Sequence, residues 1–203
     1  MPSMTPCCGT SVGVIVTDAA GRLLMIERGW YPVGIAPVAG HIADAHTDAA
    51  AAVVAEVSEE VGLTVTAHTV VADGFWLPNL CASPPSAIPG HRWTLVTAAV
   101  TGELAPDPVE TKGARWYTPG QVEVLAGRTL ALARGDISDA DYAFEPGLEP
   151  VWLELLHRAK VRSALSGELT AARRLYTTPP ECYWDADRGV EVPAEQAAAT
   201  LNA

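Results

Sequence analysis

Basic residues are scarce in this chain and are absent from its central part. The 203 residues include 13 Lys and Arg against 24 Asp and Glu, which gives a net charge of −11, and no Lys or Arg occurs between Gly29 and His91. Proteins bind nucleic-acid polymers mainly through Lys and Arg side chains that contact phosphates. The composition therefore argues against a nucleic-acid polymer as a partner, and an anionic small molecule would need a cation to bridge it to the protein.

Long apolar runs are also lacking. No segment approaches the roughly 20 apolar residues that a membrane-spanning helix needs, and the first residues, MPSMTPCCGTS, lack the basic region and apolar stretch of a secretory signal. We therefore expect a cytoplasmic protein with no membrane partner. Hydrophobic residues make up 49% of the chain and charged residues 18%, which is typical of a folded globular protein.

Cysteine is scarce too, with only four residues in the chain: Cys7, Cys8, Cys81 and Cys182. In a cytoplasmic protein these are expected to be free thiols rather than disulfides. Cys7, Cys8, Cys81 and His91 offer the ligand types that zinc prefers, but their spacing matches no standard zinc pattern. We therefore favour buried thiols and a loop histidine, with a zinc site as the alternative.

The order of the predicted elements indicates an α+β fold. Alternating and β-branched segments predict strands at residues 11–16, 22–28, 63–76, 91–102 and 113–119. Helices are predicted at residues 48–61, 119–129 and 148–165. The first two strands are expected to form a hairpin, and the tail after Tyr176 is expected to pack irregularly or to be partly disordered. This order fits a mixed β-sheet between helices, an α/β/α sandwich.

Three carboxylates share one edge of the first predicted helix. Each helical residue advances by about 100°, so Glu56, Glu59 and Glu60 fall within an arc of about 100°, beside an arc of valines. Exposed glutamates on a helix are commonly paired with Lys or Arg one turn away, but none lies there. Clustered carboxylates raise each other's pKa unless a cation lies among them, and hard divalent ions such as Mg²⁺ prefer oxygen ligands. A solvated charged face and a divalent-cation site both fit this pattern.

The residues around these glutamates resemble a known family. Residues 40–63, GHIADAHTDAAAAVVAEVSEEVGL, resemble the signature of the Nudix hydrolases, G-x5-E-x7-R-E-U-x-E-E-x-G-U, where U is aliphatic. The positions that match are Gly40, Glu56, Val57, Glu59, Glu60, Gly62 and Leu63. The preceding APVAGH resembles the usual PGGH turn of the family, and the resemblance covers roughly residues 11–130. It implies a Nudix fold over residues 1–145, with residues 146–203 as a C-terminal helical extension and tail packed on the same domain.

Two positions depart from the family pattern. The motif's Arg is Ala55 here, and its first Glu is absent because one residue too many separates Gly40 from Glu56. The candidates to replace that Glu are Asp44, His46, Thr47 and Asp48. In the family the Arg and the first Glu help to hold the loop and to orient the metal-binding glutamates. We therefore expect either reduced activity or a loop that is held differently, for example by His41 or Asp44.

The resemblance implies a metal-dependent hydrolase that cleaves a diphosphate bond in a nucleoside diphosphate linked to another moiety. Glu56, Glu59 and Glu60 would bind Mg²⁺ or Mn²⁺, and the metal would neutralise the phosphate oxygens and lower the pKa of the attacking water. Glu110, just before the last predicted strand, is a candidate general base. Its simpler interpretation is an ordinary acidic residue of a surface loop.

Several residues around the motif are candidates for substrate binding. Arg28, at the end of a predicted strand, could contact a phosphate, and Gly40 and His41 form the turn beside it. Trp30 and Trp76 could stack on a base. Each has a simpler interpretation, because an arginine at a strand end is commonly exposed and aromatic residues at strand ends are more often in the core.

A second hypothesis is a catalytically impaired Nudix-fold module that binds a nucleotide or has a regulatory role. Ala55 and the missing first Glu favour it, whereas the retention of three mutually repelling glutamates opposes it. A third concerns the amphipathic segment 148–165, which could bind a partner. Such a helix more often completes its own domain or forms a homodimer interface.

Overall fold

The computed structural model of the protein describes residues 5–43, 46–185 and 188–201, and two β-sheets lie at its centre. The larger sheet has the order β4–β1–β6–β5, in which β1 runs parallel to β6 and the other neighbours are antiparallel. Its strands are β1 (Thr10–Val16), β4 (Val38–His41), β5 (Thr64–Leu77) and β6 (His91–Thr101). The smaller sheet, β3–β2–β7, is antiparallel. It consists of β2 (Leu23–Arg28), β3 (Ile35–Ala36) and β7 (Thr111–Tyr117).

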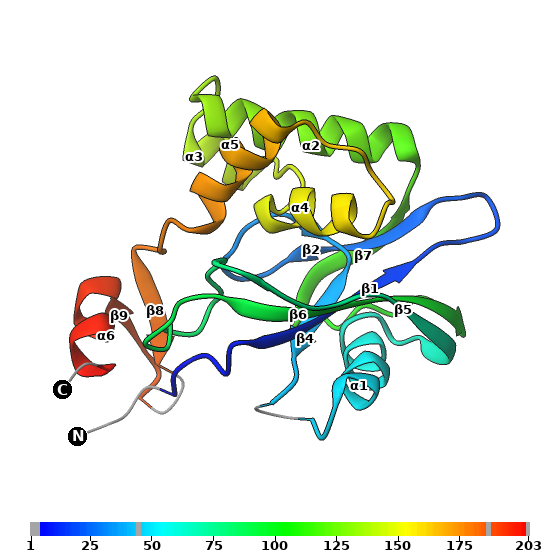
Figure 1. Cartoon of the computed structure of the whole chain (residues 1–203), viewed down its shortest axis with the longest axis horizontal. Helices are drawn as coiled ribbons and strands as arrows, with labels where there is room; N and C mark the ends of the chain where they lie inside the picture. Colours follow the sequence, from blue (N-terminus) through cyan, green and yellow to red (C-terminus); the bar gives the residue numbers. More distant parts are fainter. Residues whose placement is uncertain (1–4, 44–45, 186–187, 202–203) are drawn as a thin grey trace.

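Helices lie on both sides of these sheets (Figure 1). One side carries α1, and the other carries α4 with α2 and α5 stacked beyond it and the short α3 beside them. Their bounds are α1 (Ala49–Val61), α2 (Pro119–Arg134), α3 (Asp139–Phe144), α4 (Pro150–Arg158) and α5 (Ser166–Tyr176). The expected α+β fold, with a mixed sheet between helices, is therefore confirmed.

Each side of the sheets has its own hydrophobic core. On one side, Val53 and Val57 of α1 pack against the valines of β1. On the other side, Trp152 and Leu156 of α4 are fully buried among residues of the sheets, α2 and α5. Because α4 is enclosed between the sheets and two further helices, it is apolar on most of its surface, which is typical of a buried helix.

Helix α1 begins and ends at the residues that the sequence predicts. The side chain of Asp48 accepts a hydrogen bond of 2.8 Å from the N–H of Ala51, which caps the first turn. Gly62 adopts a left-handed conformation with φ of 69°, and its N–H donates to the carbonyls of Ser58 and Val57. With both ends fixed and the valine face buried, the adjacent glutamate edge is held against the end of β4.

The hairpin expected between the first two strands is not present as a ladder. β1 and β2 belong to different sheets and share only the isolated bridge between Thr17 and Leu23. β1 is buried along almost its whole length and takes β4 and β6 as its neighbours. A strand that is covered on both faces and paired on both edges needs partners from distant segments, which a local turn signal does not reveal.

The C-terminal part also differs from expectation. The single helix predicted over residues 148–165 ends at Arg158, where Lys160 turns the chain with a positive φ of 59° before α5 begins. The tail, expected to pack irregularly, contains an antiparallel pair, β8 (Cys182–Asp185) and β9 (Val190–Pro193), followed by α6 (Ala194–Leu201). Tyr183 pairs with Val192 in register, and with Ala197 they form a small apolar cluster, which explains why this segment folds.

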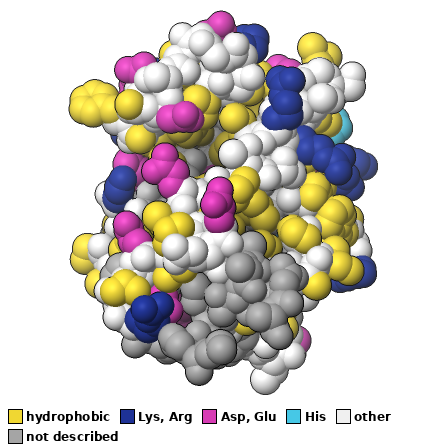
Figure 2. Space-filling view, turned by 90° about the vertical axis from the view of Figure 1, so that its left-hand side faces the viewer, with side chains coloured by type: hydrophobic (Ala, Val, Ile, Leu, Met, Phe, Trp, Pro, Cys, Tyr) yellow, Lys and Arg dark blue, Asp and Glu magenta, His cyan; other side chains and the backbone are white. Residues whose placement is uncertain are grey.

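The molecular surface agrees with the acidic composition. On the face shown in Figure 2, acidic side chains are spread over the left half and the centre, whereas most of the visible Lys and Arg side chains lie toward the right-hand edge. None of the helices within the described residues has the length and apolarity required to cross a membrane.

Candidate functional site

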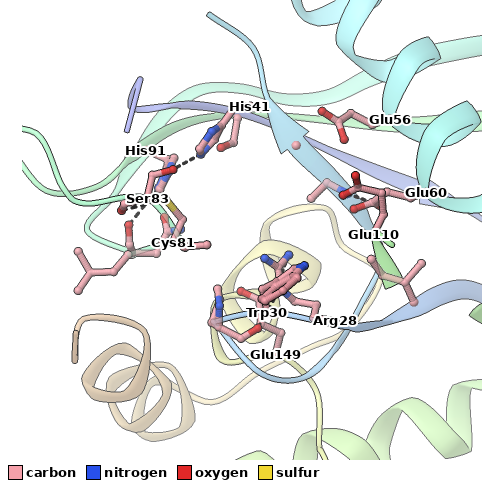
Figure 3. A pocket seen from close by; sticks show the side chains of 18 of the residues that line it. Arg28, Trp30, His41, Glu56, Glu60, Cys81, Ser83, His91, Glu110 and Glu149 are labelled. Atoms are coloured by element: carbon pink, nitrogen blue, oxygen red, sulfur yellow. Dashed lines mark hydrogen bonds and ion pairs between the residues drawn. The ribbon is translucent and has the colours of Figure 1, made fainter. Parts of the chain in front are cut away.

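A pocket of about 220 Å³ opens beside the second half of α1, where the ends of β2 and β4 meet the loop between β5 and β6. Three groups of side chains line it (Figure 3). They are the carboxylates Glu56, Glu60 and Glu110, the cluster of His41, Cys81 and His91, and the group of Arg28, Trp30 and Glu149. The pocket therefore joins most of the residues that the sequence singles out, although they come from six different segments.

Glu60 is a strongly perturbed acid of the pocket. Its Oε2 accepts a hydrogen bond of 3.3 Å from the N–H of Ala39 in β4. Burial raises the pKa of Glu60 to about 8, and although Arg28 lowers it, Glu56 and Glu110 raise it further. A carboxylate in this environment is destabilised in its charged form unless a cation approaches it.

Glu56 lies one turn before Glu60 on the same edge of α1. Its Oε1 is 3.4 Å from Nε2 of His46, and burial raises its pKa while His46 lowers it. A Cβ atom at Gly40 would overlap with the carboxylate of Glu56. Gly40, predicted to bind substrate, therefore has a clear structural role: β4 needs a glycine here because any side chain would displace Glu56.

Glu59 and Glu110 lie at different depths. Glu59 is exposed and does not line the pocket, but its charge is close enough to raise the pKa of Glu56. Glu110 lines the pocket from the segment just before β7, where a turn places its N–H 3.2 Å from the carbonyl of Asp107. The structure thus brings together Glu56, Glu60 and Glu110 and leaves Glu59 outside the pocket lining.

The sequence leaves open whether a Lys or Arg from another segment pairs with the glutamates of α1. Among the residues that the structure describes, no Lys or Arg forms an ion pair with Glu56, Glu59 or Glu60. Arg28 lowers the pKa of Glu60, but its ion pair is with Glu149. Glutamates that remain partly buried without such partners favour a bound cation over a solvated face.

Arg28 points into the pocket from the end of β2. Its Nε donates to the carbonyl of Pro32 at 2.9 Å, and its guanidinium lies 3.8 Å from the carboxylate of Glu149. Glu149 is 4% exposed, and burial raises its pKa while Arg28 lowers it. The sequence reasoning missed Glu149, and the available signal was an acid that directly precedes the apolar start of α4.

The two tryptophans proposed for substrate binding lie in different places. Trp30 is 62% exposed and lines the pocket beside Arg28. Trp76 does not line it; its ring packs close to Gly90 and borders a separate, apolar groove that includes Ile88. The structure therefore supports the candidacy of Trp30 by position and does not bring Trp76 to the carboxylates.

His41 belongs to the sulfur-containing wall of the pocket. Its Nε2 lies 3.5 Å from Sγ of Cys7 and 3.3 Å from Nε2 of His91, and Cys81 completes the group. Cys8, named with this group from the sequence, lies outside it and has its Sγ 3.4 Å from the carbonyl of Thr10. His91, expected in a loop, is the first residue of β6 and is 2% exposed.

The family assignment rests on residues 9–136. The sequence model of the NUDIX domain family matches residues 9–136, which is more than half of the chain. The chain belongs to the Nudix family. The matched region contains the acidic edge of α1, Arg28, His41, Cys81, His91 and Glu110, whereas Glu149 and the helices that follow it lie beyond the match.

Solved structures with a related arrangement include a Deinococcus radiodurans protein, DR0079, with 17% identity, covering 74% of this chain and 82% of that chain, at a TM-score of 0.49. Another is the NUDIX domain of Shewanella oneidensis NrtR complexed with ADP ribose, with 12% identity and a TM-score of 0.49. The match covers 79% of this chain and 90% of that chain. A NUDIX hydrolase from Nitrosomonas europaea has 16% identity and a TM-score of 0.44, and the match covers 59% of this chain and 77% of that chain. No match is found among curated protein sequences.

The structure shows what stands in for the missing parts of the Nudix motif. Of the four candidates to replace the first Glu, His46 contacts Glu56 directly, whereas Asp48 caps α1. Thr47 has no hydrogen bond to the site, and Asp44 lies outside the described residues. Of these candidates, the described one that contacts Glu56 is thus an imidazole, and Ala55 contributes no charge.

Proposed function

We propose that this Nudix protein is a metal-dependent hydrolase that cleaves a diphosphate bond in a nucleoside diphosphate linked to another moiety. The observation that carries the proposal is the pair of enclosed carboxylates, Glu56 and Glu60, with which no Lys or Arg of the described residues forms an ion pair. An acidic protein with such a pair can bind an anionic substrate only if cations lie between them.

The donor set fits hard divalent ions. Glu56, Glu60 and Glu110 present oxygen ligands to one pocket, and the exposed Glu59 would add a fourth from the solvent side. Burial raises the pKa of Glu60, and a bound cation would favour its charged form. Bound Mg²⁺ or Mn²⁺ would neutralise the phosphate oxygens and lower the pKa of the attacking water.

The protein's own groups have distinct roles in this proposal. The carboxylate of Glu110 accepts a proton from the attacking water, whose oxygen forms a bond to phosphorus as the bridging P–O bond breaks. The guanidinium of Arg28 binds a phosphate oxygen, and Glu149 together with the carbonyl of Pro32 holds that guanidinium in place. Trp30, at the rim, offers a flat surface on which a base can stack.

A phosphate-release assay tests the proposal. The substrates are nucleoside di- and triphosphates, nucleotide sugars, ADP-ribose and coenzyme A, each with and without Mg²⁺ or Mn²⁺. We expect turnover of at least one substrate that depends on the metal and is lost in Glu60→Gln while circular dichroism remains unchanged. Tight nucleotide binding without turnover, measured by calorimetry, would instead support the impaired binding module that Ala55 and the missing first Glu suggest.

A further inference from the structure

The second wall of the pocket contains four metal-binding side chains that the proposed hydrolysis does not use. Cys7 precedes β1, His41 ends β4, Cys81 lies in the loop between β5 and β6, and His91 begins β6. One ligand atom from each lies within 4.8 Å of all the others. Figure 3 shows His41, Cys81 and His91 gathered on the side of the pocket opposite the glutamates.

Two of the three distances among Cys7, His41 and His91 match those of a tetrahedral zinc site. With Zn–S bonds of about 2.3 Å and Zn–N bonds of about 2.0 to 2.1 Å, such a site places two nitrogens about 3.3 Å apart and a sulfur and a nitrogen about 3.5 Å apart. In the structure, the Nε2 atoms of His41 and His91 are 3.3 Å apart, and Sγ of Cys7 is 3.5 Å from Nε2 of His41 and 3.0 Å from Nε2 of His91. The third distance is shorter than the tetrahedral value, so an ion would fit once the side chains of Cys7 and His91 move apart.

Hydrogen bonds around the cluster orient its ligand atoms. Nδ1 of His91 lies 3.0 Å from the carbonyl of Asn79, which can only accept, so Nδ1 carries the proton and the lone pair of Nε2 points into the cluster. Asn79 is itself fixed, because its Oδ1 accepts from Nε1 of Trp93 at 2.9 Å. The N–H of Gly9 lies 3.3 Å from Sγ of Cys7 and stabilises a thiolate there.

The backbone places Cys7 in the cluster as well. The N–H of Cys7 donates to the carbonyl of Pro84 at 2.8 Å, and the N–H of Arg92 donates to the carbonyl of Gly9 at 2.8 Å. The segment before β1 therefore runs between the long loop and the start of β6. All four cysteines of the chain are free, so no disulfide occupies Cys7 or Cys81.

We propose that Cys7, His41, Cys81 and His91 bind one zinc ion in a closed structural site. Two thiolates and two neutral imidazoles balance the charge of a divalent ion, so the site can be buried without a large electrostatic cost. Sulfur and nitrogen ligands in a tetrahedron select zinc over Mg²⁺, whereas the carboxylates of the other wall have the opposite preference.

The proposed ion joins four segments that the hydrolytic site needs in fixed positions. It ties the N-terminal segment and the long loop to β4 and β6, and His41 directly follows Gly40, which makes room for Glu56. Four protein ligands leave no open coordination position, so the role is structural. Zinc would therefore fix one wall of the pocket before any substrate arrives.

Metal analysis of the full-length protein tests this proposal. We expect about one zinc ion per chain after purification without chelators, with loss of that zinc in Cys81→Ser and in His91→Ala. Cys8→Ser and Cys182→Ser serve as matched controls, because neither thiol belongs to the cluster, and both should keep the zinc. Glu60→Gln should also keep it, so that a failure of the proposed hydrolysis does not affect this result.

A spectroscopic measurement covers the case in which the variants do not fold. X-ray absorption at the zinc edge of the wild-type protein should show two sulfur and two nitrogen neighbours, and replacement by Co²⁺ should give the intense visible bands of a tetrahedral thiolate site. Zinc-free wild-type protein that does not bind Co²⁺ would overturn the proposal. So would a disulfide between Cys7 and Cys81, or equal zinc contents in Cys81→Ser and wild type.

Discussion

The two walls of the pocket differ in chemistry and in how the chain builds them. The carboxylate wall takes Glu56 and Glu60 from adjacent turns of one helix, whereas the sulfur and nitrogen wall joins residues as far apart as Cys7 and His91, 84 positions along the chain. The first offers hard oxygen ligands and the second soft sulfur and nitrogen ligands. The comparison teaches that local spacing shows one proposed metal site in the sequence, whereas the complete ligand set of the second, with His41 in place of Cys8, is seen only when distant segments meet.

The largest effect is expected from the carboxylate wall. Glu60→Gln removes a proposed metal ligand, so turnover should fall by at least about a hundredfold, with zinc content unchanged. Steady-state kinetics and metal analysis on the same sample measure both. Glu103→Gln, a change at an exposed acid far from the pocket lining, is the control and should retain wild-type turnover. Equal turnover in the two variants would remove Glu60 from the catalytic machinery.

Substitutions in the sulfur and nitrogen wall should lower the thermal stability of the protein more than its turnover. Cys81→Ser removes a proposed zinc ligand, and because zinc binding is coupled to folding, Tm should fall by at least about 5 °C. Differential scanning calorimetry measures the change. Cys8→Ser, at a neighbouring thiol outside the cluster, should shift Tm by less than about 2 °C. A similar shift in both variants would mean that the two walls do not differ in the proposed way.

Gly40 links the two walls, since it touches Glu56 and precedes His41. Gly40→Ala adds a Cβ that overlaps with the carboxylate of Glu56, so turnover should fall about tenfold through displacement of that carboxylate. Gly127→Ala, where an added Cβ meets nothing within 4 Å, is the matched control and should leave turnover unchanged. If Gly40→Ala retained full activity, the position of Glu56 would be unimportant for the reaction.

Substitution of Arg28 tests whether a cationic side chain contributes to substrate binding beside the proposed ions. Arg28→Ala should raise KM about tenfold through loss of a phosphate contact, and it should lower Tm because buried Glu149 loses its cationic neighbour. In the double variant Arg28→Ala with Glu149→Gln, Tm should recover while KM stays high. Recovery of both quantities would show that Arg28 acts only through stability.

The smallest expected effect is on KM when the exposed Trp30 is replaced. Trp30→Ala should raise KM about fivefold if the ring stacks on a base, because Trp30 lines the pocket. Trp76→Ala removes an equally large and partly exposed ring that does not line it, and KM should stay within error of wild type. The reverse order of effects would place the base beyond the loop between β5 and β6.

Much of the fold could be predicted from local patterns. The cap at Asp48, the stop at Gly62 and the helix start at Pro119 are predictions that the structure confirms. The failures were pairings: β1 and β2 do not form a hairpin, and Tyr183 and Val192 pair in a tail expected to be irregular. Strand pairing depends on contacts between distant segments, and a single sequence shows periodicity but not partners.

By itself, the sequence determined that one helix edge carries carboxylates with no basic residue near it, because a helix has a fixed angular spacing and its neighbours can be read directly. Only the tertiary structure decided that Arg28 forms its ion pair with buried Glu149 rather than with that edge, and that His41 rather than Cys8 joins Cys7, Cys81 and His91. These are contacts between groups brought together by packing, and their energies depend on burial and distance, which the order of residues does not contain.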